Sequence, residues 1–168
     1  MTLSLYEICV PGLLRTLGSI SAIIDKAQAH CAAKKIDQSV IVNYRLAADM
    51  LPFSRQIQIM SDQAKGMGAR LTGAEVPSWT DSETTLDDLK ARIAKTVDYL
   101  KGLKADAFKG AETRDISLKA GANEFKFKGL DYATNWVFPN FYFHATTAYD
   151  ILRHAGVEIG KRDFLGGV

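Results

Sequence analysis

A histidine, an aspartate and a glutamine are the residues of this chain whose types and spacing best suit shared chemistry. His144 follows the aromatic-rich run Trp136–Phe143 and lies on the shoulder of a predicted apolar helix stripe. Asp49 and Gln56 are one heptad apart, so they are predicted to share one shoulder of an earlier helix. If the two helices pack together, these side chains converge on one site for a small-molecule ligand, a metal or a general base. The alternative is a hydrogen-bonded core histidine, with Asp49 and Gln56 forming a structural Asp–His pair or a solvated edge of the helix.

Weaker candidates lie nearby on the same predicted helices. Tyr149 is on the opposite shoulder of the last helix from His144, and we include it as a ligand-binding candidate. Asp62 falls nearly opposite the apolar stripe of its helix, which indicates a solvent-facing acid. His154 lies near a helix end, where a cation suits the helix dipole without further function. The sequence has no HExxH, CxxC, Walker or GxGxxG motif.

Long apolar stripes with helical spacing must position these residues. Apolar side chains recur at steps of three and four over residues 6–31 and again over residues 46–71. Each stripe contains one proline, Pro11 or Pro52, and continues past it, so we predict a kink at each proline rather than a helix end. Stripes of this length are typical of a helical bundle.

Two further helices and a hairpin complete the predicted architecture. A third helix begins with a threonine cap after the Pro/Ser/Thr-rich connection 76–85. Alternating apolar and polar residues around a Gly/Asn turn predict a β-hairpin within residues 116–127, packed against the helices. A fourth helix covers residues 138–155, and the tail at 160–166 is predicted to pack over one end of the bundle.

Composition and charge indicate one soluble domain. The chain has 168 residues, of which 47% are hydrophobic and 24% are charged, with a net charge of +2. This composition excludes disordered and disulfide-scaffold proteins, and gives no basic surplus for a nucleic-acid partner. The apolar stretch from Ile8 to Ile24 contains Arg15 and lacks a positive leader, so we expect neither a signal peptide nor a membrane span. We predict a single domain over residues 1–168, located in the cytoplasm.

The two cysteines are predicted to be reduced and buried. Cys9 and Cys31 lie on the first predicted helix. At about 1.5 Å rise per residue their separation is roughly 33 Å. A disulfide needs Cα atoms about 5.5 Å apart, so no internal bridge is expected.

The last helix and its flank carry a resemblance to a known family. The run Pro139–His144 (PNFYFH), residues 147–157 and the closing GKRD at 160–163 resemble the C-terminal signature of a domain-of-unknown-function family. Residues 46–52 and Gln56 are similar to the same family. The family is grouped with the DinB/YfiT-like superfamily of metalloenzymes. The resemblance covers essentially the whole chain, and implies an all-α, DinB/YfiT-like four-helix bundle with a small β-hairpin before the last helix.

The resemblance also implies a divalent-metal centre, of which this sequence keeps a part. Active members of the superfamily bind the metal through one histidine on the second helix and two on the fourth in HxxxH spacing. His144 matches the first histidine of that pair, but Ala148 stands at the second. Asp49 would have to replace the histidine of the second helix. We therefore predict no resident cofactor, and name His144 and Asp49 as the ligands if a metal such as zinc or nickel binds.

Two functions follow as hypotheses. The first is a small-molecule-binding or structural module with a degenerate metal site, whose ligand would lie among Asp49, Gln56, His144 and Tyr149. The alternative is a divalent-metal-dependent hydrolase or thiol transferase with a remodelled site around His144 and Asp49. The sequence leaves open whether the protein is an enzyme. In either case we expect a homodimer formed by outer faces of the bundle, with no nucleic-acid or membrane partner.

Overall fold

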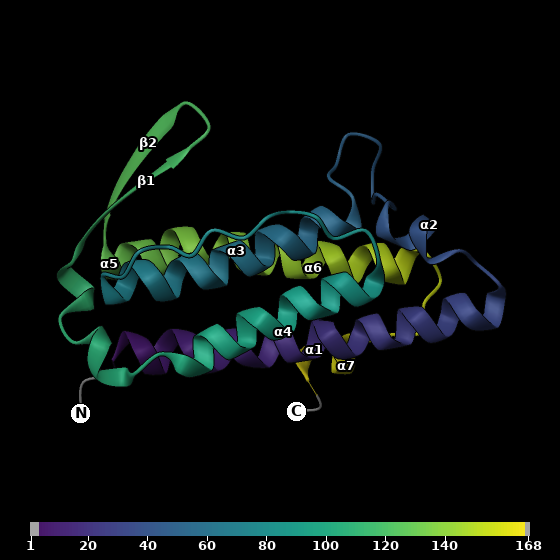
Figure 1. Ribbon diagram of the computed structural model, residues 1–168, viewed down its shortest axis with the longest axis horizontal. Helices are drawn as coiled ribbons and strands as arrows, with labels where there is room; N and C mark the ends of the chain where they lie inside the picture. The colour runs from purple at the N-terminus through teal and green to yellow at the C-terminus, as the bar shows by residue number, and fades with distance from the viewer. Residues whose placement is uncertain (1–3, 167–168) are drawn as a thin grey trace.

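Four long helices lie side by side in the structure (Figure 1). The computed structural model describes residues 4–166. The four helices are α1 (Leu5–Lys34), α3 (Phe53–Thr72), α4 (Leu86–Gly102) and α6 (Phe138–His154). Around the bundle each helix contacts its neighbours in the order α1, α4, α3, α6. The predicted all-α four-helix bundle with a hairpin before the last helix is confirmed.

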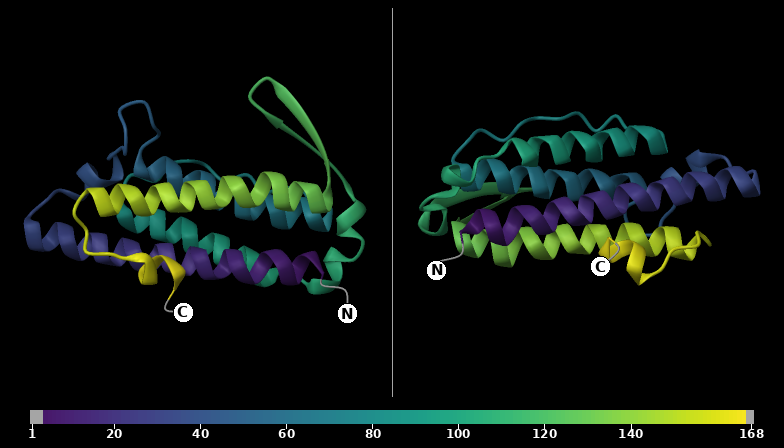
Figure 2. Two further views of the ribbon diagram at one scale, coloured as in Figure 1. Left: turned by 180° about the vertical axis from the view of Figure 1, so that it is seen from behind. Right: turned by 90° about the horizontal axis from the view of Figure 1, so that it is seen from below.

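The helices follow one another up, down, down and up. The colours of Figures 1 and 2 show that α1 and α6 run in one direction while α3 and α4 run in the other. Because α3 and α4 are parallel, the chain between them must return along the bundle. Residues 73–85 make this return on the outside of α3 and have no helix or strand of their own. We call residues 73–85 the crossover segment.

Local signals explain where α1 and α4 begin. Ser4 and Glu7 form a capping box at the start of α1, and Thr85 and Asp88 form one at the start of α4. Each box satisfies backbone N–H groups that have no partner inside the helix. The predicted threonine cap is therefore confirmed at Thr85. Pro11 lies inside α1, and the helix continues past it as predicted.

The second long helix begins later than the sequence predicts. The apolar stripe predicts helix through residues 46–52 with a kink at Pro52, but α3 begins at Phe53 with Pro52 as its N-cap. Proline disfavours helical backbone in the residue before it. The Phe53 N–H instead donates to the Tyr44 carbonyl over 2.9 Å. Residues 46–52 thus form a loop after α2 (Gln38–Val42), a short helix that the sequence analysis does not predict.

The predicted hairpin is present, and one face of its strands, which carries the buried Ile116 and Leu118, packs on the bundle. Strands β1 (Asp115–Ala120) and β2 (Asn123–Lys128) pair antiparallel. The tip projects away from the helices in Figure 1. At the base, Phe127 lies 5.7 Å from Trp136 and 6.0 Å from Tyr132, measured between ring centroids. Aromatic contacts of this kind anchor the hairpin to the segment before α6.

Short helical segments connect the main elements. The last long helix is preceded by a π-helical turn that the sequence analysis does not predict. The tail forms a short helix that contacts α1, where Lys26 donates to Asp163 over 2.6 Å. These segments are η1 (Ala105–Phe108), η2 (Ala111–Thr113), α5 (Gly129–Asp131), the π-helical η3 (Tyr132–Val137) and α7 (Lys161–Leu165).

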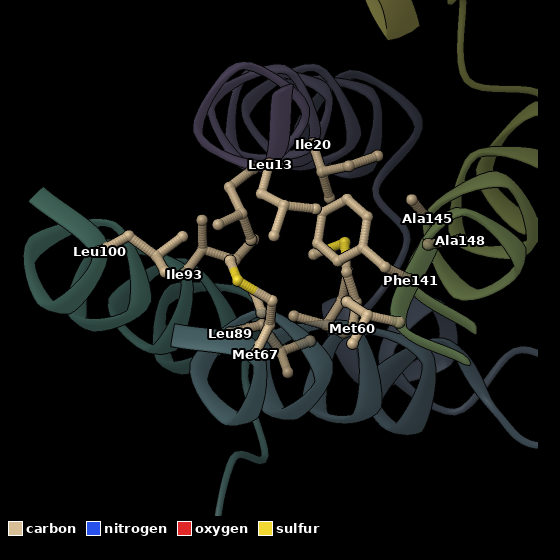
Figure 3. Close-up of a cluster of buried hydrophobic side chains, with 14 of the residues drawn as sticks. Leu13, Ile20, Met60, Met67, Leu89, Ile93, Leu100, Phe141, Ala145 and Ala148 are labelled. Carbon is tan, nitrogen blue, oxygen red and sulfur yellow. The ribbon is translucent and has the colours of Figure 1, made fainter. Parts of the chain in front are cut away.

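The core fills the space between the four long helices. Figure 3 shows leucine, isoleucine and methionine side chains of α1, α3 and α4 meeting Phe141 and two alanines of α6. Cys9 and Cys31 are free and buried, as predicted. Burial raises the pKa of the Cys9 thiol to about 12. Both cysteines therefore belong to the packed face of α1.

One helix in the described part of the chain, α1, is long and apolar enough to cross a membrane. Length and composition alone give this result, and a core helix has the same properties. Half of the residues in its most apolar window are buried inside the bundle. The property is therefore weak support for a membrane span.

Candidate functional site

His144 and Gln56 meet between α6 and α3. The His144 Nδ1 atom lies 2.7 Å from the Gln56 Oε1 atom. Gln56 is 1% exposed and lies in the first turn of α3, because that helix starts at Phe53. The Gln56 amide nitrogen donates to the Leu51 carbonyl over 2.9 Å. The loop before α3 thus holds the glutamine, and the glutamine holds the histidine.

This chain of hydrogen bonds fixes the proton on the imidazole. The Leu51 carbonyl only accepts, so the amide nitrogen of Gln56 must face it and the amide oxygen must face His144. That oxygen also only accepts, so His144 Nδ1 carries the hydrogen. In the neutral ring the Nε2 atom then carries the lone pair.

Burial keeps the imidazole neutral. Desolvation lowers the pKa of His144 below its ordinary value. Within residues 4–166, Nε2 forms no hydrogen bond to protein, and it is not among the fully buried unpaired atoms. The Nε2 atom is therefore open to solvent or to a ligand, and it acts as an acceptor.

Asp49 does not lie on the same helix as Gln56. It belongs to the loop before α3, its side chain is exposed, and no hydrogen bond joins it to His144 in the described part of the chain. The predicted placement on a helix shoulder is wrong because Pro52 starts α3 rather than kinking it. The residue that contacts the histidine is therefore Gln56 of α3, and not Asp49 of the preceding loop.

Tyr149 lies away from the His144–Gln56 pair. Its ring packs edge-on against Phe164 of α7, with 5.8 Å between the ring centroids. Five residues separate His144 and Tyr149 on α6, which turns the two side chains to different faces of the helix. A ligand-binding role for Tyr149 stays a prediction.

The side chains around His144 do not fit the three-histidine centre of the superfamily. Ala148, four residues after His144, is fully buried and has no donor atom. The oxygen of Gln56 is already engaged by the imidazole N–H. Among the described residues there is no group of three or more His, Cys, Asp or Glu side chains that could hold a metal ion. A structural zinc needs four such ligands and a catalytic one needs three. We therefore assign no chemical step to a metal.

A second polar cluster, not predicted from the sequence, joins α4, α3 and the crossover segment. The side chain of Arg92 is 2% exposed and contacts three carboxylates. Its guanidinium nitrogens lie 2.9 Å from Asp62, 3.0 Å from Asp81 and 2.8 Å from Glu83. Asp62 is thus half-exposed but paired, rather than a freely solvated acid. Neither Asp49 nor Asp62 bonds to a residue of α6.

The cluster holds the crossover segment on the bundle. Gln58 of α3 donates to Glu83 over 2.8 Å, and Arg55 of α3 pairs with Asp81. Burial alone would raise the pKa of Glu83, but hydrogen bonds from Arg92 and Gln58 hold it below the ordinary value. Both acids therefore stay ionised and paired at neutral pH.

Helical spacing is the signal that identifies Arg92. It lies three residues after Leu89 and four before Thr96, and these buried neighbours place it on the inner face of α4. A charged residue at such a position is rarely buried unless it is paired. The apolar pattern alone does not reveal the arginine, because it is a charged residue on an otherwise apolar face.

Comparisons with known proteins agree with the fold. The family model for the domain of unknown function DUF1993 matches residues 5–165. A crystal structure of a DinB family member from Shewanella denitrificans is 44% identical and superimposes with a TM-score of 0.91, covering 98% of this chain and 93% of that chain. No curated protein matches the sequence. The chain therefore belongs to the DUF1993 family, within the DinB-like superfamily.

Proposed function

We propose that this protein is a small-molecule-binding member of the DinB-like bundles, in which the pair His144–Gln56 takes the place of the superfamily's metal centre. The observation that carries the proposal is the hydrogen-bond chain from the Leu51 carbonyl through Gln56 to His144. This chain presents a neutral imidazole with an open acceptor atom, Nε2. A site of this kind binds a hydrogen-bond donor without a metal.

The surroundings of the histidine support a ligand with an apolar body. Phe143 is 56% exposed and lies edge-on to the imidazole, with 5.2 Å between ring centroids. Leu51, whose carbonyl holds Gln56, also has an exposed side chain. Small-molecule sites combine apolar and aromatic side chains with a small number of positioned polar groups. The expected ligand therefore carries a hydroxyl or another neutral donor on an apolar frame.

The alternative function, a metal-dependent hydrolase or thiol transferase, requires His144 and Asp49 to share a metal. The exposed loop position of Asp49 and the lack of any bond from it to the histidine among residues 4–166 favour metal-free binding instead. Metal content distinguishes the two functions. We expect protein purified without added metal to contain no stoichiometric transition metal, as measured by elemental analysis. A stoichiometric zinc or nickel ion that is lost in His144→Ala would overturn the proposal.

A direct test follows the imidazole by NMR. Phenol serves as the probe because it combines one hydroxyl donor with an apolar ring. In protein with ¹⁵N-labelled histidine, we expect saturable addition of phenol to shift the His144 Nε2 resonance. The exposed His154 provides the internal control and should not shift. Equal and non-saturating shifts of both resonances would contradict the proposed site.

A further inference from the structure

A cleft of about 280 Å³ opens between α3 and the hairpin, in addition to the His144 site. Four parts of the chain line it: α3, the crossover segment, β1 and the π-helical turn η3. Trp136 and Leu118 provide apolar walls. Trp136 is held by Phe125 and Phe127 at centroid distances of 4.9 and 5.7 Å. The cleft is thus built by segments that are distant in sequence and fixed by packing.

The charges lining the cleft are mostly positive. Lys65, Arg70 and Lys119 line it together with a single acid, Asp62. Asp62 is already shared, because its Oδ1 atom lies 2.8 Å from Lys65 Nζ and 2.9 Å from Arg92. The net charge of the lining is therefore +2, as large as that of the whole chain. A concave surface with charges of one sign concentrates ions of the opposite sign.

Arg70 is held in place without a carboxylate. Its guanidinium donates to the Tyr132 hydroxyl over 3.0 Å and lies 5.8 Å from the centre of that ring. Burial raises the pKa of Tyr132, so the phenol stays neutral. In the described part of the chain Arg70 forms no salt bridge with an acid. Among these residues its positive charge is therefore not paired directly with a carboxylate.

The backbone of α3 makes room for this arginine. A Cβ atom at Gly66 would lie 2.4 Å from a guanidinium nitrogen of Arg70. The glycine thus lets the side chain fold back over one turn of α3 toward Tyr132. On the other wall, the side chain of Lys65 is 5% exposed, and its ammonium lies 4.5 Å from the centre of the Trp79 ring. Two of the three cations are therefore positioned before any ligand arrives.

We propose that this cleft binds a small organic anion, with its carboxylate or phosphate against Arg70, Lys65 and Lys119 and its apolar body against Trp136. The planar fork of a guanidinium matches the oxygens of either group. The volume suits a ligand about the size of a single substituted ring. Carboxylate and phosphate share this chemistry, and the test below separates them.

The experiment uses Trp136 as an internal reporter. The chain has two tryptophans, so Trp79→Phe leaves Trp136 as the only one and keeps an aromatic ring under Lys65. Fluorescence of this protein is followed while inorganic phosphate or benzoate is added, at an ionic strength held constant with sodium chloride. We expect saturable quenching or enhancement by at least one of the two probes. Benzoate alone supports a carboxylate ligand, and phosphate alone supports a phosphate ligand.

Variants connect the signal to the cleft. Arg70→Gln should weaken binding by about tenfold or more, because it removes the fork that faces the anion. Lys119→Gln, at an exposed hairpin position that does not threaten folding, should weaken it several-fold. Lys126→Gln makes the same charge change on the neighbouring strand outside the cleft and should leave binding unchanged. The absence of saturable binding by either probe would overturn the proposal, as would equal affinities in the Lys119→Gln and Lys126→Gln proteins.

Discussion

At the scale of single residues, the partner of His144 determines what the imidazole can do. A metal centre uses the lone pair of a neutral imidazole, and a second group usually fixes the tautomer through the other ring nitrogen. Gln56 does fix the tautomer here, but Ala148 supplies no second ligand. The tautomer of His144 is therefore fixed as it is in a metal ligand, but the second histidine of such a centre is missing. This arrangement is the basis of the proposed recognition of a hydrogen-bond donor.

The buried imidazole predicts a pH dependence of stability. The pKa of His144 is lowered in the folded protein by burial, whereas in the unfolded chain it has its ordinary value near 6.5. Protons therefore bind preferentially to the unfolded state, and stability falls as the pH drops from about 6.5 toward the lowered folded value. We expect the free energy of unfolding in urea to decrease over this range, and to decrease less in His144→Asn.

His154→Asn is the matched control for that measurement. His154 is exposed on the last turn of the same helix. The variant should keep the pH dependence of the original protein. If His144→Asn also keeps this pH dependence in full, burial does not hold the imidazole neutral, and Nε2 is not kept as an open acceptor.

Single residues of the site were predictable to different degrees. Gln56 and His144 could be identified because both lie on helices whose apolar stripes fix their faces. Asp49 could not be placed, because Pro52 permits either a kinked helix or a helix start. The hydrogen bond from the Phe53 N–H to the Tyr44 carbonyl favours the helix start over the kink. A tertiary contact of this kind is not visible in the apolar pattern.

At the scale of elements, Arg92 connects two parallel helices and the segment that joins them. The buried guanidinium pairs with Asp62 of α3 and with Asp81 and Glu83 of the crossover segment. Burying such a cluster costs desolvation free energy, and the cluster stabilises the fold chiefly when all its members are present. Loss of the arginine leaves Glu83, largely buried, without its main partner.

Substitution of Arg92 should therefore destabilise the protein strongly. Arg92→Met keeps much of the side-chain volume and removes the charge. We expect a loss of about 3 kcal/mol in the free energy of unfolding, the lower end for breaking a buried ion pair. Chemical denaturation measures this loss. Lys101→Met, at an exposed position of the same helix, is the control and should change stability little. Equal stabilities of the two variants would show that the cluster does not hold the crossover segment.

The elements themselves were largely predictable, and the reason is periodicity. Long stripes gave α1, α4 and α6, and the alternation around a two-residue turn gave the hairpin. The π-helical turn at Tyr132–Val137 carries no such signal. Its aromatic residues fit an α-helix equally well. The hairpin packs against Trp136 and Tyr132, and the local sequence pattern does not reveal this tertiary contact.

At the scale of the whole molecule, α6 carries two aromatic side chains on its exposed surface. Phe143 and Tyr142 are adjacent there and both are exposed. Exposed aromatic side chains are enriched at protein interfaces. The homodimer expected from the sequence stays a prediction, and these two exposed aromatic side chains are a candidate part of its interface.

Sedimentation tests the dimer. We expect the protein to sediment as a dimer at micromolar concentration, and Phe143→Ser to shift it toward monomer because the substitution removes an apolar contact of the interface. Leu130→Ser removes a similarly exposed apolar side chain outside α6 and should leave the dimer intact. A monomer in the unsubstituted protein would rule out the predicted assembly under these conditions.

The parallel arrangement of α3 and α4 also limits how the chain can vary in length. A helix of 20 residues such as α3 is about 30 Å long. An extended chain covers at most about 3.3–3.6 Å per residue. The crossover segment of 13 residues, between Thr72 and Leu86, has therefore only about four residues to spare. Insertions here would add a surface loop at little cost, whereas deletions beyond that margin would force α4 to start a turn late or α3 to end a turn early.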